Sequence, residues 1–196
     1  MRTAMSGRFA LRLRADSRRT TTGPRALMVL VVLSALAALP ASAGRASGSA
    51  ETSQQTRQAG PPEGGCIIEV IPVVFGSYDV NSPAPLDSYS TLTFNCSPIP
   101  GEGRVPHVRI EIGAGSSGMI GQRRMQGPGG FVNYNLYLDA VRQVIWGDGS
   151  QGSQTFELDS PQPNQDHVVP IYGRVPPMQA VSQGHYDDAL TVTILF

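Results

Sequence analysis

Ala189-Leu190-Thr191-Val192-Thr193-Ile194-Leu195-Phe196 is an alternating apolar run at the end of the printed sequence. Its even-numbered side chains share one face of a β-strand, because strand side chains alternate with a period of two. These residues are Leu190, Val192, Ile194 and Phe196. We therefore expect a half-buried strand whose outer hydrogen-bonding edge lacks a partner within this chain. An open apolar edge promotes aggregation unless a second polypeptide covers it.

The first 43 residues have the three parts of an export signal. Seven of the fifteen arginines lie in residues 1–25, and residues 26–39 are apolar. Ala41-Ser42-Ala43 then supplies the small residues of a signal-peptidase site. We predict that residues 1–43 are removed on export, take no part in the fold and leave a mature chain that starts at Gly44. The apolar run is short for a membrane span, so an uncleaved anchor is the alternative.

Removal of the leader changes the net charge of the chain. Eight arginines and fourteen acidic residues remain in residues 44–196, which gives a net charge of −6. Nucleic acids and anionic membrane surfaces bind basic protein faces. The composition therefore argues against both classes of partner for the mature protein.

Cys66 and Cys96 are the only two cysteines in the sequence. In an exported chain an isolated pair favours a disulfide over a metal site or a redox thiol. The bridge would close a loop of 30 residues and would stabilise the fold by roughly 3–4 kcal/mol. We predict that it ties the first strand to the strand that ends at Cys96.

The composition changes at Cys66. Residues 44–65 contain no Val, Ile, Leu or aromatic residue, which predicts a disordered linker. From Cys66 onward, short β-type runs alternate with Gly, Pro, Asn and Asp, and none has helical periodicity over three turns. The predicted strands are Cys66–Val74, Ser90–Cys96, Val108–Gly113, Val132–Leu138, Gln143–Trp146, Gln154–Leu158, Val168–Val175 and Ala189–Phe196. We therefore predict an all-β domain over residues 66–196, an immunoglobulin-like antiparallel β-sandwich.

The sequence contains no constellation that indicates catalysis or cofactor binding. The glycines of 113–118 and 147–152 match the spacing of dinucleotide-binding loops, but no helical pattern follows either stretch. Residues 114–118, Ala-Gly-Ser-Ser-Gly, differ by one residue from a nucleophile elbow and lack the same helix. His107, His167 and His185 are scattered without metal-ligand spacing. We therefore expect no enzyme activity, no catalytic residue, no cofactor and no metal.

Aromatic residues beside turns recur along residues 75–188. The stretches are Phe75-Gly76-Ser77-Tyr78-Asp79, Tyr134-Asn135-Leu136-Tyr137-Leu138-Asp139-Ala140, Val144-Ile145-Trp146-Gly147-Asp148-Gly149, Ile171-Tyr172-Gly173-Arg174-Val175 and Gly184-His185-Tyr186-Asp187-Asp188. Taken singly, each is explained by a core aromatic next to a tight turn. We predict that Phe75, Tyr137 and Trp146 belong to the core.

Taken together and in this order, the aromatic stretches resemble the spore coat protein U domain family. This is a family of secreted pilus subunits and adhesins that archaic chaperone–usher systems assemble. The resemblance extends from Cys66 to Phe196, and Arg123-Arg124-Met125 fits the same pattern.

The resemblance implies an immunoglobulin-like domain that lacks its final strand. In this family a periplasmic chaperone fills the resulting groove, and the N-terminal extension of a neighbouring subunit replaces it at the usher, which is donor-strand complementation. It implies export to the periplasm and then to an adhesive cell-surface fibre. The apolar face of 190–196 would form one wall of the groove. Candidates for the opposite wall are Ile67, Ile68, Val70, Val73 and Val74.

One departure from the family pattern concerns the donor strand. Residues 44–65 have no large apolar side chain to insert into a neighbour's groove. We therefore expect a protein that accepts a strand but donates none, either at a fibre tip or as a stand-alone member. The alternative is a self-complete secreted β-sandwich that acts as a binding or coat protein.

Overall fold

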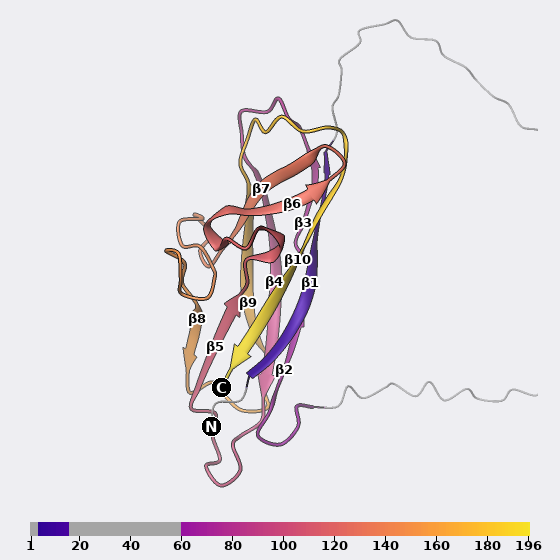
Figure 1. Cartoon of the computed structure of the whole chain (residues 1–196). Coiled ribbons are helices and arrows are strands. Elements are labelled where there is room, and N and C mark those ends of the chain that lie inside the picture. The colour runs from indigo at the N-terminus through magenta and orange to yellow at the C-terminus, as the bar shows by residue number, and fades with distance from the viewer. Residues whose placement is uncertain (1–3, 16–59) are drawn as a thin grey trace, which may run out of the picture. The chain divides into compact units, whose positions relative to one another are not determined.

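A computed structural model describes residues 4–15 and 60–196 (Figure 1). Apart from two 3-10 turns, Gly115–Ser117 and Ile120–Gln122, every regular element in these residues is a β-strand. The predicted all-β class is therefore confirmed. No helix of the described part is long and apolar enough to cross a membrane. The predictions for residues 16–59, including the apolar run, the cleavage site and most of the linker, lie outside the described residues.

The strands form two hydrogen-bonded groups that β7 connects. The first group, called here the β4 sheet, runs in the order β2 (Cys66–Val70), β4 (Leu86–Cys96), β9 (His167–Val175) and β7 (Gly130–Tyr137). The second, the β10 sheet, contains β8 (Phe156–Asp159), β5 (His107–Ile112), β10 (Gly184–Leu195), β1 (Ala4–Ala15), β3 (Val74–Tyr78) and β6 (Arg123–Gly127). Every pairing is antiparallel except that of β1 with β3.

Alternating burial along the strands produces one core. In β4 the even-numbered residues from Ser90 to Cys96 are buried, and in β10 the even-numbered residues from Tyr186 to Ile194 are buried. Apolar residues of both sheets belong to a single buried cluster. The arrangement is consistent with the predicted immunoglobulin-like sandwich.

The predicted strand Cys66–Val74 is divided at Pro72. The last backbone-to-backbone hydrogen bond to β4 runs from the N–H of Ile71 to the carbonyl of Thr91, at 3.0 Å. The chain then continues as β3, which pairs with β1 and not with β4. Proline has no N–H for a ladder and breaks the pairing. One predicted strand is therefore two, each in a different sheet.

Six other predicted strands correspond to β4, β5, β7, β8, β9 and β10, with shifted ends. The prediction for Gln143–Trp146 is wrong, because this segment makes only isolated bridges, Tyr137 to Ile145 and Trp146 to Gln154. Strand β6 was not predicted. Its sequence, Arg-Arg-Met-Gln-Gly, contains one large apolar residue and offers no apolar alternation.

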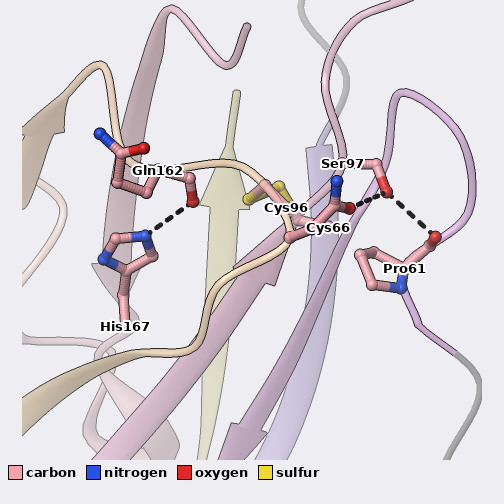
Figure 2. The surroundings of a disulfide bond; sticks show 7 residues. Pro61, Cys66, Cys96, Ser97, Gln162 and His167 are labelled. Atoms are coloured by element: carbon pink, nitrogen blue, oxygen red, sulfur yellow. Dashed lines mark hydrogen bonds between the residues drawn. A yellow bond between two sulfur atoms is a disulfide. The ribbon is translucent and has the colours of Figure 1, made fainter.

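The disulfide between Cys66 and Cys96 is present, as predicted (Figure 2). The two cysteines are register partners at the end of the β2–β4 pair. Next to the bridge, the hydroxyl of Ser97 contacts the carbonyl of Pro61 at 3.1 Å and the side-chain oxygen of Asn164 at 3.2 Å. This corner of the β4 sheet is therefore held by covalent and polar links together.

Two of the three predicted core aromatics are buried. Phe75 is 5% exposed and Trp146 is fully buried, with its indole N–H donating to the carbonyl of Ile110 at 3.0 Å. Tyr137 differs from the prediction, because it is only half-buried and does not belong to the core cluster. The inward positions of β7 are Val132, Tyr134 and Leu136. Tyr137 has the opposite parity and lies on the other face of the strand.

Candidate functional site: the gap between β10 and β3

Strand β10 has two hydrogen-bonding edges, and different parts of the chain pair with them. One edge pairs with β5 over Val192–Leu195 and with β6 at Asp187. The other edge pairs with β1 alone (Figure 1, indigo beside yellow). The expectation that this edge has no partner within the chain is therefore wrong.

The pairing of β1 with β10 extends over all 12 residues of both strands. It is antiparallel and runs from Ala4 opposite Leu195 to Ala15 opposite Gly184. Residues 4–15 belong to the same compact unit as residues 60–196. The expectation that nothing before Gly44 takes part in the fold is therefore wrong for residues 4–15 of the full chain. Removal of residues 1–43 on export stays a prediction.

Strand β1 also pairs with β3, in parallel orientation. Arg12 lies opposite Val74 and Ala15 opposite Tyr78, with an irregularity in register after Arg12. Within the described residues no pairing joins β3 directly to β10. The domain formed by residues 60–196 therefore has a gap of one strand between β10 and β3, and β1 occupies it.

The sequence of β1 has the alternation of a strand with one apolar side. Phe9, Leu11 and Leu13 are the register partners of residues on the buried face of β10. The intervening positions include Arg8, Arg12 and Arg14. This alternation is the sequence signal for β1, but the same arginines also fit the basic part of an export leader, which was the prediction made for them.

The side chains that line the gap come from the predicted face of β10. Leu190 and Ile194 are fully buried and Val192 is 1% exposed, whereas Phe196 lies just beyond β10 and is half-buried against the core. On the opposite side the wall is β3, which buries Phe75 and Tyr78. The candidates Ile67, Ile68 and Val70 are not part of this wall, because β2 belongs to the β4 sheet.

A buried carboxylate interrupts the apolar face of β10. Asp188 is 3% exposed, and its Oδ2 accepts a hydrogen bond of 2.8 Å from the hydroxyl of Tyr134. Its Oδ1 accepts bonds from the backbone N–H groups of Ser116 at 2.9 Å and of Ala189 at 3.0 Å. Burial, and then the charge of Asp188, raises the pKa of Tyr134. These donors satisfy the carboxylate, so it can remain in the wall of the gap.

A buried arginine holds the strands beside the gap. Arg123 is fully buried and donates hydrogen bonds of 2.8–2.9 Å to the carbonyls of Gly113, Ile112 and Trp146 and to the side-chain oxygen of Asn135. Burial lowers the pKa of Arg123 to about 10, so the side chain stays charged at neutral pH. In the sequence Arg123 stood out only as part of the Arg123-Arg124-Met125 motif, and this role was not predicted.

Asp188 and Arg123, the buried charged groups beside the gap, are engaged in structural bonds. Asp188 accepts from a tyrosine and from backbone amides, and Arg123 donates mainly to backbone carbonyls. In residues 4–15 and 60–196 no three His, Cys, Asp or Glu side chains are placed to hold a metal ion. The chemistry that this site offers is backbone hydrogen bonding along a strand edge together with apolar burial.

Comparison with known sequences gives the family. The model of the Spore Coat Protein U domain matches residues 62–193, which is more than half of the chain. The chain belongs to the spore coat protein U domain family. Protein U of Myxococcus xanthus is 33% identical over 136 residues, which cover 62% of this chain and 70% of the relative.

Membership of the family indicates a structural subunit of coat or pilus type, associated with the cell surface, and not an enzyme. The matched segment begins shortly before Cys66 and ends within β10. It therefore contains both walls of the gap, β10 and β3, but not β1, the strand that occupies it.

Proposed function

We propose that this protein is an exported fibre or coat subunit whose gap between β10 and β3 accepts a strand from another polypeptide. The donor is a periplasmic chaperone first and a neighbouring subunit afterwards, delivered at an usher. One observation supports this proposal above all. Residues 60–196 leave one edge of β10 without a strand of their own, and the strand found there comes from beyond residues 16–59.

The physical argument is that an empty gap is costly. Without β1, one edge of β10 and one edge of β3 would expose unpaired backbone N–H and C=O groups, and the apolar side chains beneath would meet water. An added strand satisfies those groups through main-chain bonds and covers the apolar wall, which is the β-augmentation mode of recognition. Alternating side chains at Leu190, Val192 and Ile194 would set the register of the incoming strand.

Cleavage of residues 1–43 would determine the place of the subunit in a fibre. Once residues 1–43 are cleaved, the chain retains the acceptor gap, and residues 44–65 contain no large apolar side chain with which to donate a strand. Such a subunit accepts without donating, which suits the tip of a fibre. A role in adhesion would follow from that position.

A second candidate function is a self-complete secreted β-sandwich that acts as a binding or coat protein. The specific observation in its favour is β1 itself, which fills the gap from within the same chain. In this alternative the leader strand would remain attached and no foreign strand would be needed.

An experiment that supplies a strand to residues 44–196 distinguishes the two candidate functions. Since Ala4 lies opposite Leu195 in an antiparallel pair, residues 4–15 can be fused after Phe196 through a short hairpin loop. We expect residues 44–196 alone to aggregate or to melt at low temperature, and the fusion to be a soluble monomer with a markedly higher Tm.

The matched control is the same fusion with Phe9, Leu11 and Leu13 replaced by serine, which keeps the length and the loop but removes the apolar alternation. It should behave like the unfused protein. If residues 44–196 form a stable monomer that gains nothing from the fused strand, the acceptor function is contradicted and the self-complete sandwich is favoured.

A further inference from the structure

The structure shows which segment fills the gap in the full chain, and this has a consequence for processing. We propose that residues 4–15 close the gap in cis until residues 1–43 are removed, so that cleavage of the leader opens β10 and β3 to a second chain. Closure of the gap in cis concerns the uncleaved chain alone. Opening of the gap by cleavage rests on the proposed acceptor function.

The extent of the pairing supports occupation in cis. Strand β1 meets β10 over its full length and meets β3 over Arg12–Ala15, so both walls of the gap are engaged at once. A single segment thereby removes two open strand edges, which are the surfaces most prone to aggregation.

The charge pattern of β1 also fits β10. Arg12 is the register partner of Asp187, which is exposed and lies on the outer side of β10. Opposite charges directly across an antiparallel pair are favourable. Seven arginines precede residue 26, whereas residues 44–196 carry a net charge of −6. The leader segment is therefore complementary in charge to the domain that it completes.

The connection between β1 and the domain is long enough for the pairing. Residues 16–59 separate β1 from the next described residue and could span up to roughly 150 Å if extended. A strand as long as β10 measures only about 40 Å. A covalent link of this length allows β1 to reach the gap of its own chain.

The same link gives β1 an advantage over any competing strand. Tethered segments act at effective concentrations up to about millimolar. A donor of equal intrinsic affinity at micromolar concentration would then occupy about one gap in a thousand. Hydrolysis of the Ala43–Gly44 bond, in which water supplies the hydroxyl to Ala43 and the proton to the Gly44 amine, removes that advantage. Cleavage would thus serve as the switch from a closed subunit to an acceptor.

Cross-linking in the full chain tests occupation in cis. Ala10 and Ala189 are register partners, and Ala189 is exposed on the outer side of β10. In an Ala10→Cys, Ala189→Cys variant with residues 1–43 retained, mild oxidation should join the two new cysteines within one molecule. Cys66 and Cys96 do not interfere, because they are bonded to each other. Mass spectrometry of peptides from the non-reduced monomer is the readout.

The control pairs Ala10→Cys with Thr193→Cys, whose register partner is Ser6. This pair is about four residues out of register, roughly 13 Å along the strand, and lies beyond disulfide reach. A monomeric cross-link in the first variant and none in the control supports the proposal. Absence of the cross-link, or cross-links only between two chains, would overturn occupation in cis.

Peptide uptake tests the switch. A site for a sequence-specific protease is placed at Gly44 of the full chain, and a fluorescent peptide of residues 4–15 is added in excess before or after cleavage. We expect the cleaved protein to bind the peptide at least roughly a hundred-fold more strongly than the intact one. Equal uptake by both would overturn the switch. If residues 44–196 take up no strand at all, the proposed acceptor function fails, while the cross-linking result still reports on occupation in cis.

Discussion

The two halves of one predicted strand, Cys66–Val74, complete the two sheets in different ways. Strand β2 pairs directly with β4, and the Cys66–Cys96 disulfide makes that pairing covalent. Strand β3, which follows within a few residues, reaches β10 only through β1. The first edge is closed by a strand of the same domain, and the second by residues 4–15.

The two edges differ in how lastingly their partner strands are attached. At the β2–β4 edge the partner strand is part of the same domain, so the closure persists for as long as the domain is folded. At the β10–β3 edge the partner is joined through residues 16–59, so the closure depends on whether the leader is attached. One small domain therefore has a covalently tied edge and an edge that, under the proposed function, is exchangeable.

The largest expected effect is at the exchangeable edge. Val192→Asp in the full chain puts a carboxylate at a position that is 1% exposed and belongs to the buried apolar cluster. An unpaired buried charge costs several kcal/mol, so we expect loss of the folded monomer. The measurement is urea unfolding together with size-exclusion chromatography.

Thr193→Asp is the matched control, because Thr193 adjoins Val192 and has the opposite parity. It should remain a folded monomer. Equal damage from the two substitutions would show that the parity assigned to this edge is wrong.

The next largest effect is expected at the tied edge. Replacing Cys66 and Cys96 together by alanine opens a loop of 30 residues and should lower the free energy of unfolding by about 3–4 kcal/mol. The gap should still accept a strand, because neither cysteine lies on β10 or β3. A variant that folds but no longer takes up the residue 4–15 peptide would contradict the independence of the two edges.

A smaller effect is expected from Tyr134→Phe beside the gap. The substitution removes the 2.8 Å hydrogen bond from the hydroxyl to Asp188 and leaves that carboxylate with two backbone donors. Loss of one buried bond to a charged group costs about 1–3 kcal/mol, measured by urea unfolding at pH 7.

The stability that Tyr134 contributes should depend on alkaline pH. The pKa of Tyr134 is raised in the folded protein, chiefly by burial, so the unfolded state loses its proton first. The stability from this group is complete below the unfolded pKa of about 10 and declines as the pH rises above it. The difference in unfolding free energy between the native protein and Tyr134→Phe should therefore decrease above pH 10. A difference that increases would contradict the assigned cause.

The smallest effect is expected on the outer face of the β4 sheet. Asp87 accepts two hydrogen bonds from Arg174, at 2.7 and 2.9 Å, and lies 3.3 Å from Arg142. The bond with Arg174 is the main cause that lowers the pKa of Asp87. Because the group is partly exposed, Asp87→Asn should cost less than about 1 kcal/mol at pH 7.

The same substitution predicts a dependence on acid pH. A lowered folded pKa gives stability that is present above the unfolded pKa of about 3.9 and is lost as the pH falls through the folded value. The melting temperatures of Asp87→Asn and the native protein should therefore converge below pH 3.9. A constant difference down to pH 2 would show that the ion pair is not its source.

Several features of the fold could be predicted from single segments. The alternation of residues 189–196 identified the buried face of β10, and an isolated pair of cysteines identified the disulfide. Period-two patterning also located β4, β5, β7 and β9. Each of these depends on side-chain parity or on residue type, which are local properties.

Other features depend on which strands become neighbours. The parity of Tyr137 could not be inferred from its aromatic motif, because alternation separates two faces without saying which one meets the core. The change of sheet at Pro72 was visible as a break, but the new partner of β3 was not.

For this protein the sequence by itself determined the β class, the disulfide and the apolar face of the last strand. Only the tertiary structure showed that residues 4–15 pair with that strand and that β3 lies on their other side. The physical reason is that a strand's side chains are set by its own sequence, whereas its hydrogen bonds are made to backbone groups that carry no sequence signal. The partner of an open edge is therefore decided by the folded chain as a whole.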